Sequence, residues 1–526
     1  MNILKILYFG LLLVATLVPA KHALHMFQQN RYELKRYFHW LIENFARAAK
    51  RGVLPLLIIL VTLIPAIITP RTALVICVIM AALLVGYEIG KEREAQYIKP
   101  LVYTGRVKRQ IVLMAILCIL IYSSVFFYDE KYLNWGVLAF TYIGPWLLMF
   151  VVGAITSPIE HGVQNWYLKD AKKKLDAHNN LIKIGITGSY GKTSTKNVMQ
   201  AVLSEKYNTL MTPASFNTPM GITKTVRELL KPIHQVFICE MGADKVGDIT
   251  ELMEFVHPSV GIVTSIGPQH LATFGSQENI TREKMQMIER LPENGVGVLN
   301  YDNELIRNYK LTRNIPIITY GIKSQDVDYH AENIKYSENG TKFTVCHEDG
   351  RVDFDTKLLG KLNILNILSS IAVARHLGIS WALIQRAVKE VKQVEHRLEI
   401  KKINGLTFID DAFNANPSGA KTALNVLSEM PGKRYIVTPG MIDLGPQQAT
   451  INRTFGTQML GKVDEVILVG ADQVQPIYEG LEESGFDMDH VKVVSSVKEA
   501  FAIIWAHATK EDTILLENDL PDAFSH

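Results

Sequence analysis

The hydrophobic and polar positions divide the chain into an apolar front part and a longer part of alternating short apolar runs and polar segments. Up to residue 159 the apolar runs approach or reach the roughly 20 residues that cross a bilayer as a helix. The first run also fits a cleaved signal peptide, although Val18-Pro19-Ala20-Lys21 is a poor cleavage site. We predict five membrane-spanning helices, over Ile6–Pro19, Val53–Thr69, Thr72–Gly90, Ile111–Tyr128 and Trp135–Thr156.

The basic residues between these runs predict the orientation of the helices. Seven Lys and Arg residues lie in Lys21–Arg51 and six in Lys91–Arg109, whereas the other two connections are short. Because basic loops stay in the cytoplasm, five spans place the N-terminus outside and everything after Ile159 inside. The sequence therefore predicts a multi-pass protein of the cell membrane with cytoplasmic domains.

The remainder, from Glu160 on, has the pattern of an α/β protein. Glu160–Asn180 is polar and helix-like; with its lysines it fits either a linker helix or a segment lying on anionic headgroups. From Leu181 short apolar runs alternate with helical patterns, which favours a mostly parallel sheet covered by helices. Val327–Leu359 breaks this rhythm and predicts a small β insertion. A second α/β module starts near Glu395. The predicted domains are 1–160 (membrane region), 161–180 (linker helix), 181–394 (central domain with a phosphate-binding loop) and 395–526 (Rossmann-like C-terminal domain).

Charge and cysteine content narrow the function classes. The chain has 16 Lys and Arg against 7 Asp and Glu up to residue 159, and 39 against 45 afterwards. A basic membrane surface followed by an acidic soluble part does not suggest a nucleic-acid-binding protein. The four cysteines form no CxxC pair, so the sequence suggests neither a zinc site nor disulfides.

Residues 187–194, Thr-Gly-Ser-Tyr-Gly-Lys-Thr-Ser, follow a predicted strand and precede a predicted helix. This order predicts a phosphate-binding loop, because glycines at 188 and 191 let successive N–H groups point at phosphate oxygens. Lys192 would reach the terminal phosphates of a nucleoside triphosphate, and the hydroxyl of Thr193 or Ser194 would bind Mg²⁺. The loop departs from the Walker A pattern, since Ile186 stands where that pattern begins with glycine.

Four further clusters contain residues suited to phosphate and metal chemistry. They are Ile238–Ala243, with Glu240 at the C-terminal end of a strand; Thr264–His270 with Glu283-Lys284; Gly360–Asn366; and a last group that joins Glu395-His396-Arg397 to Ile409–Pro417 and Pro439–Gly445. Taken singly each has an ordinary explanation: a solvated strand-end acid for Glu240, a surface or core histidine for His270, a charged helix start for Lys284, and helix caps for Asn363 and Asn366.

Together with Thr212–Gly221, these clusters resemble the Mur ligase family, in the family's order and over about residues 181–526. The similarity is closest to the branch that adds D-Ala-D-Ala to UDP-MurNAc-tripeptide; where that branch has a domain for the UDP-sugar, this chain has membrane spans. The resemblance implies an ATP- and Mg²⁺-dependent amide ligase that acts through an acyl phosphate on a cell-wall precursor, such as a lipid-linked one, with an amino acid or dipeptide as the amine. Membrane lipids and proteins of wall synthesis are further expected partners.

The resemblance also implies roles for individual residues. Lys192, Glu240, His270 and Lys284 are the expected catalytic residues; Thr193, Glu240, His270 and Lys284, the last as a carbamate, would hold the metal. The nucleotide would be bound by Gly188, Ser189, Gly191, Lys192, Thr193, Ser194, Asn366, Arg397 and Asp411, and the substrates by Asn217, Asn414 and Asn416.

The sequence departs from the family pattern in three places. Leu362 and Asn452 stand where the family usually has histidines, and the run Leu515–Asp522 stands in place of the usual Lys-Gly-Ser. These changes leave the ATP chemistry intact and put the amino substrate in question. Two alternatives therefore stay open: a poly-γ-glutamate-type synthase, and a non-catalytic ATP-binding scaffold of the wall machinery.

Overall fold

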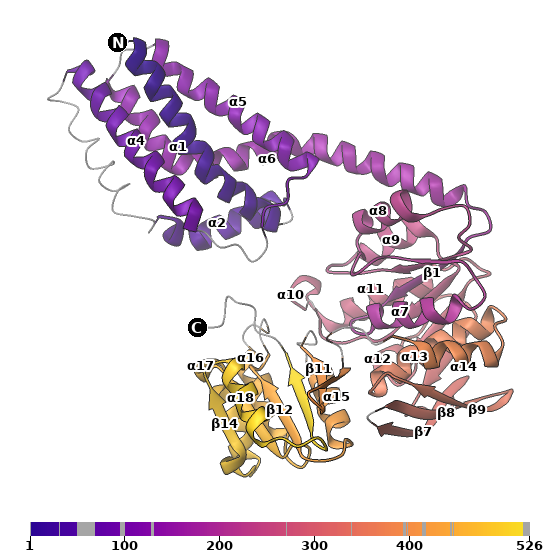
Figure 1. Cartoon of the computed structure of the whole chain (residues 1–526). Helices are drawn as coiled ribbons and strands as arrows, with labels where there is room; N and C mark the ends of the chain where they lie inside the picture. Colours follow the sequence, from indigo (N-terminus) through magenta and orange to yellow (C-terminus); the bar gives the residue numbers. More distant parts are fainter. Residues whose placement is uncertain are drawn as a thin grey trace. The chain divides into compact units, whose positions relative to one another are not determined.

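The computed structural model describes residues 2–30, 32–49, 69–94, 100–127, 131–269, 271–337, 339–392, 396, 398–412, 417–441, 444 and 447–518. They form two compact units, Met1–Trp166 and Tyr167–His526. The first unit is helical and contains α1 (Asn2–Gln29), α2 (Leu34–Ala49), α4 (Pro70–Glu94), α5 (Gly105–Phe127) and most of α6 (Lys131–Asp176) (Figure 1).

Four helices of the described chain are long and apolar enough to cross a membrane. They cover Asn2–Gln29, Pro70–Arg93, Gly105–Phe127 and Gly144–Asp176. These correspond to the first, third, fourth and fifth predicted spans. The second predicted span, Val53–Thr69, lies outside the described residues except for its last residue.

The last predicted span and the predicted linker helix belong to one continuous helix, α6, so the predicted limit at residue 160 falls inside it. Within the first unit, Glu160 of this helix accepts two hydrogen bonds of 2.8 Å from Arg109 of α5, through Nε and a terminal guanidinium nitrogen. This two-point contact fixes the geometry between the two helices better than a single ion pair would.

The end of α6 is part of the second unit. Ala171 and Leu175 are buried in an apolar cluster of that unit. Lys172 and Lys174 donate to the carbonyl oxygens of Glu254 and Arg227, at 2.8 and 3.1 Å. These two lysines therefore contact the α/β unit, whereas the alternative of a segment lying on lipid headgroups would have left them facing a membrane surface.

The second unit begins with a nine-stranded sheet in the order β2-β3-β1-β4-β5-β6-β7-β8-β9. Neighbours are parallel from β2 to β7, and β7, β8 and β9 form the predicted β insertion as antiparallel neighbours. The strands are β1 (Ile182–Thr187), β2 (Thr209–Met211), β3 (Val236–Glu240), β4 (Val260–Val263), β5 (Val296–Asn300), β6 (Ile317–Gly321), β7 (Tyr329–Ser337), β8 (Gly340–His347) and β9 (Gly350–Thr356).

Helices cover both faces of this sheet, so that the central strands β3, β4 and β5 are buried along their whole length. One face packs against α7 (Lys192–Leu203), α13 (Lys361–His376) and α14 (Trp381–Glu390). The other packs against α8 (Pro219–Leu229), α9 (Asp248–Val256), α11 (Gln277–Glu289) and the end of α6. The short helices α10 (Leu271–Phe274) and α12 (Glu304–Arg307) lie in connections.

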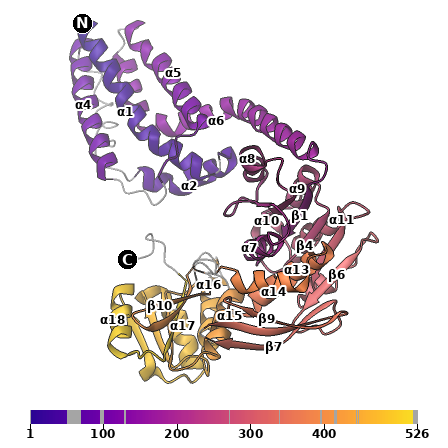
Figure 2. The ribbon, with the colours of Figure 1, turned by 45° about the vertical axis from the view of Figure 1, so that its right-hand side comes forward.

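A second sheet has the order β10-β11-β15-β12-β13-β14 and is parallel except for β10. Its strands are β10 (Glu399–Ile403), β11 (Leu406–Asp411), β12 (Arg434–Thr438), β13 (Glu465–Val469), β14 (Val491–Val494) and β15 (Thr513–Glu517). The helices α15 (Pro417–Ser428), α16 (Gln448–Thr457) and α17 (Ala471–Glu483) pack on one face and α18 (Val497–His507) on the other (Figure 2). Apolar helices followed by two mostly parallel α/β domains confirm the predicted fold class.

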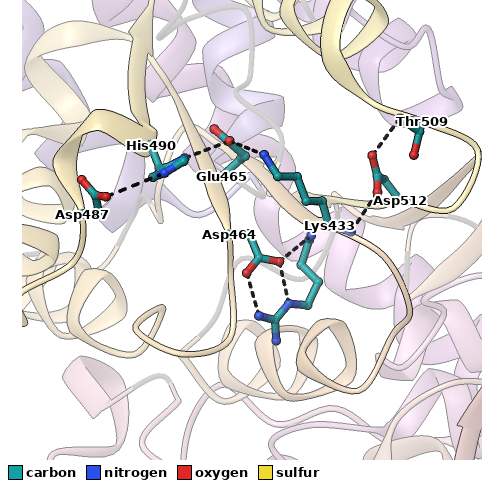
Figure 3. A network of polar contacts seen from close by, with 8 residues as sticks. Lys433, Asp464, Glu465, Asp487, His490, Thr509 and Asp512 are labelled. Carbon is teal, nitrogen blue, oxygen red and sulfur yellow. Dashed lines mark hydrogen bonds and ion pairs between the residues drawn. The ribbon is translucent and has the colours of Figure 1, made fainter.

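A charged network joins the amino ends of the parallel strands in the second sheet (Figure 3). Glu465 accepts from Lys433 at 3.1 Å and from His490 at 2.9 Å, so the His490 pKa is raised by this carboxylate. Asp512 accepts from the Lys433 amide at 2.8 Å. Ligands of such sheets bind at the carboxyl ends of the strands. Because this network lies at the opposite edge, we assign it a role in stability.

Candidate active site

The loop between β1 and α7 has the backbone that a phosphate cradle requires. Gly188 and Gly191 have φ angles of 152° and 85°. A Cβ atom would lie 2.1 Å from the Thr264 hydroxyl at position 188 and 3.1 Å from Asn366 Oδ1 at position 191. The amide of Ser189 donates to Ser265 O at 2.7 Å, which ties the loop to the end of β4. Only glycine fits the two positions, and the loop leads directly into the amino end of α7.

Lys192, the first residue of α7, folds back over this loop. Its ammonium group donates to Gly188 O at 2.7 Å and to Ser189 O at 3.4 Å. A positive charge at the amino end of a helix, beside a glycine turn, is the arrangement that binds the terminal phosphates of a nucleotide.

Glu240 ends β3, the neighbour of β1, and its carboxylate lies beside the loop. The hydroxyl of Thr193 lies 3.2 and 3.1 Å from its two oxygens, and Asn217 Nδ2 donates to Oε1 at 3.2 Å. Oε2 accepts from Lys196 Nζ at 2.9 Å. A hydroxyl and a carboxylate oxygen are hard ligands, so Thr193 and Glu240 fit a Mg²⁺ ion next to bound phosphates.

Lys284 of α11 reaches the same loop from the other face of the sheet. It is 1% exposed, and its Nζ donates to Gly188 O at 3.3 Å. Burial, with a smaller effect of the Lys192 charge, lowers its pKa to about 7. At neutral pH much of this amine is therefore uncharged, which is the state that can react with CO₂.

Two further predicted nucleotide-binding residues line the same cavity, which has a volume of about 400 Å³. Asn366 of α13 accepts from the Thr195 hydroxyl at 2.9 Å, and Asp411 at the end of β11 accepts from the Leu398 amide at 2.9 Å. The alternative that Asn363 or Asn366 caps a helix does not apply to α13, whose cap residue is Gly360. Gly191, Lys192, Thr193, Ser194, Ser189, Asn217 and Glu240 also line the cavity.

The structure thus brings together eleven of the predicted site residues, from two domains: Gly188, Ser189, Gly191, Lys192, Thr193, Ser194, Asn217, Glu240, Lys284, Asn366 and Asp411. The other four, His270, Arg397, Asn414 and Asn416, lie outside the described residues.

Two features of the site were missed from the sequence. Lys196 is 1% exposed and contacts Glu240, although its sequence signal, a lysine one helical turn after Lys192, is visible. Glu517 pairs in register with Asp411 on the adjacent strand. Burial, and then the neighbouring Asp411, raise the pKa of Glu517 well above its usual range.

A second cavity, of about 730 Å³, adjoins the first and shares Tyr190 and Leu362 with it. Asn300, Asp302 and Lys361 are among its polar lining residues, and Ile266 and Leu365 among the apolar ones. A cavity of this kind, next to a phosphate cradle, has room for the base and sugar of a nucleotide.

Comparison with known proteins agrees with this geometry. Residues 186–374 match the family description "Mur ligase middle domain", and residues 396–517 match "Mur ligase, glutamate ligase domain". The chain is 31% identical over 338 residues to UDP-N-acetylmuramoyl-tripeptide–D-alanyl-D-alanine ligase of Bacillus subtilis (strain 168), covering 64% of this chain and 72% of that relative. It is also 31% identical over 290 residues to the Escherichia coli (strain K12) protein of the same name, but spans only 64% of that protein's length.

Solved structures show the same fold. MurF ligase from Thermotoga maritima in complex with ADP superposes with a TM-score of 0.61 at 24% identity, over 68% of this chain and 80% of that one. MurF from Acinetobacter baumannii gives 0.59 at 22% identity, over 68% and 77%.

Proposed function

Because the chain belongs to the Mur ligase family of ATP-dependent amide ligases, we propose that it joins an amine to a carboxylate of a peptidoglycan precursor at the cytoplasmic face of the membrane. The observation that supports this best is the convergence of Lys192, Thr193, Glu240 and Lys284 on one glycine loop. These residues supply what carboxylate activation by ATP needs: cationic and metal-binding groups in a site of low solvent exposure.

The reaction would have two steps. A substrate carboxylate oxygen attacks the γ-phosphorus of ATP, so that an acyl phosphate forms and ADP leaves. The amine then attacks the acyl carbon, the phosphate leaves as the amide forms, and the amine loses a proton. Lys192 would neutralise the phosphate oxygens in both steps, and Asp411 and Asn366 would orient the nucleotide. Mg²⁺ held by Thr193 and Glu240, with His270 and a carbamate on Lys284 as further ligands, would act as a Lewis acid on the phosphoryl group.

We propose a muramoyl peptide as the carboxylate substrate and a D-Ala-D-Ala-like dipeptide as the amine, by analogy with the names of the relatives. The apolar helices stand where the D-Ala-D-Ala-adding branch of the family has its domain for the UDP-sugar. We therefore propose that the acceptor is presented at the bilayer, for example as a lipid-linked muropeptide. Asn217, Asn414 and Asn416 would face it. The departures from the family pattern at Leu362, Asn452 and Leu515–Asp522 are the reason to test other amines.

The test uses the full-length protein in detergent with ATP, Mg²⁺ and D-Ala-D-Ala, and with either UDP-MurNAc-tripeptide or its undecaprenyl-linked form. We expect ADP and phosphate only when both the carboxylate and the amine are present, and a product one dipeptide heavier by mass spectrometry. In a parallel reaction with glutamate as the only amino acid, a polymer of repeated units would identify the γ-glutamate-type synthase instead. ATP turnover indifferent to every carboxylate would exclude the proposal. No turnover with any acceptor would exclude it as well and would favour the non-catalytic scaffold.

The low pKa of Lys284 predicts a pH-dependent carbamate. Only the neutral amine reacts with CO₂; with a pKa of about 7, about 90% of it is neutral at pH 8 and only about 10% at pH 6. The carbamate and the ligase activity should therefore be present above pH 7 and be lost as the pH falls through 7. The measurement is ¹³C NMR of the protein in ¹³C-bicarbonate at both pH values. Lys284→Arg, which stays charged, should show no carbamate signal. An equal signal in that variant would refute the assignment.

A further inference from the structure

Lys196 is a buried cation beside the proposed metal site that the mechanism above does not use. It lies on α7 one turn after Lys192, and both its side chain and that of Glu240 are about 1% exposed. Its Nζ donates to Glu240 Oε2 at 2.9 Å and also to the carbonyl oxygen of Ala214. Burying such an ion pair costs desolvation free energy unless every polar group is hydrogen-bonded. We therefore expect Lys196 to have a function in the site.

The carbonyl that Lys196 binds belongs to the loop after β2, which wraps around Glu240. Ala214 has a φ of 43°, in the left-handed region that residues other than glycine seldom adopt. Two further contacts tie the same loop to β3: Thr212 Oγ1 accepts from the Glu240 amide at 3.1 Å, and Asn217 O accepts from the Gly242 amide at 2.8 Å. Lys196 therefore holds both the carboxylate and the loop that presents Asn217.

The charges explain why a lysine is placed there. Without a metal, Glu240 would be a buried carboxylate whose other hydrogen-bond donors among the described residues, Thr193 and Asn217, are neutral. The ammonium of Lys196 supplies the compensating charge. A divalent cation bound to this carboxylate would lie close to the ammonium group that is hydrogen-bonded to Glu240 Oε2. In a buried site these two positive charges repel each other strongly. Lys196 thus stabilises the metal-free site and weakens its affinity for metal.

We propose that Lys196 is an internal counter-cation of Glu240, which keeps the metal-free site folded and sets its divalent-cation affinity low enough for the ion to exchange. This inference rests on the proposed metal role of Glu240, but not on the identity of the acceptor. It makes Lys196 a positioning residue, since its effect on the phosphates passes through Glu240 and the Ala214 loop.

The experiment measures Mn²⁺ alone on the full-length protein in detergent, without nucleotide. Bound Mn²⁺ is counted by electron paramagnetic resonance, and the melting temperature is recorded in EDTA and in Mn²⁺. In Lys196→Met, which keeps the length and loses the charge, we expect at least a 10-fold lower Kd for Mn²⁺. We also expect a lower melting temperature than the wild type in EDTA, with most of that gap closed by Mn²⁺. Lys196→Gln, which can still donate to Ala214 O, is the second variant if the first does not fold.

Two controls make the result specific. Lys206→Met removes an exposed lysine that follows α7, donates to the backbone carbonyls of Leu377 and Gly378 and lies over the Tyr207 ring. It should change neither quantity. The double variant Lys196→Met, Glu240→Gln removes both charges, and its melting temperature should no longer depend on Mn²⁺.

Unchanged or weaker Mn²⁺ binding in Lys196→Met, or a stability loss of the same size with and without Mn²⁺, would overturn the inference and leave Lys196 a packing residue. The Glu240→Gln variant separates this failure from that of the metal site. If it abolishes Mn²⁺ binding while Lys196→Met does not alter it, the metal site stands and the counter-cation role falls. If it leaves Mn²⁺ binding intact, the metal role of Glu240 falls as well.

Discussion

Replacing Lys192 by methionine is expected to lower ATP turnover by about 10²–10³-fold while leaving the fold intact. The ammonium group lies in the glycine loop, 2.7 Å from Gly188 O, where it would neutralise charge on the transferred phosphoryl group. Methionine fills the same space without a charge, so the loss should appear in kcat more than in stability. The measurement is ADP release under saturating substrates, with the melting temperature as a check on folding.

Lys206→Met again serves as the matched control, because this exposed lysine lies outside the site and should turn over ATP at the wild-type rate. A Lys192→Met enzyme within fivefold of the wild type would mean that the loop binds something other than the reacting phosphates. Such a result would also weaken the case for ligase chemistry.

Glu240→Ala should cause the largest loss of stability, about 3–5 kcal/mol, together with loss of turnover. The substitution leaves the ammonium of Lys196 buried without its carboxylate partner at 2.9 Å. For a domain of about 200 residues this corresponds to a fall of roughly 10 °C in melting temperature. Thermal unfolding in detergent, followed by circular dichroism, measures it.

Glu254 provides the matched control for this second prediction. It also forms an ion pair, with Arg290 at 3.1 Å, but its side chain is 65% exposed. Glu254→Ala should therefore change stability by less than about 1 kcal/mol, because water solvates the charge that is left. Equal losses of stability in both variants would show that removing the buried carboxylate of the Lys196–Glu240 pair costs no more than removing an exposed one.

Much of the fold was predictable because local patterns and long-range contacts agree. Two short runs of the sequence show this: Val236–Cys239 lies within β3, and Arg434–Thr438 has the bounds of β12. In both, a short apolar run is bounded by polar residues and forms a buried parallel strand. The end of α6 was less predictable. Its polar sequence fits a solvated linker, and only the packing of Ala171 and Leu175 against the α/β unit shows that it belongs to that unit.

The candidate site divides in the same way. The glycine loop is local, so its strand, turn and helix could be inferred from eight consecutive residues. Lys196 was not identified, because its local sequence does not predict a contact with Glu240, which lies 44 positions away in the chain. The pairing of Glu517 with Asp411 depends on the register of β11 and β15, which are separated by about a hundred residues.

The sequence by itself determined the apolar spans, the alternation of strands and helices, and the phosphate loop, because each depends on residues close together in the chain. Only the tertiary structure decided which charges meet: Lys196 with Glu240, and Glu517 with Asp411. The physical reason is that strand order and register, not sequence distance, bring side chains to one edge of a sheet, and burial there decides which charges need a partner.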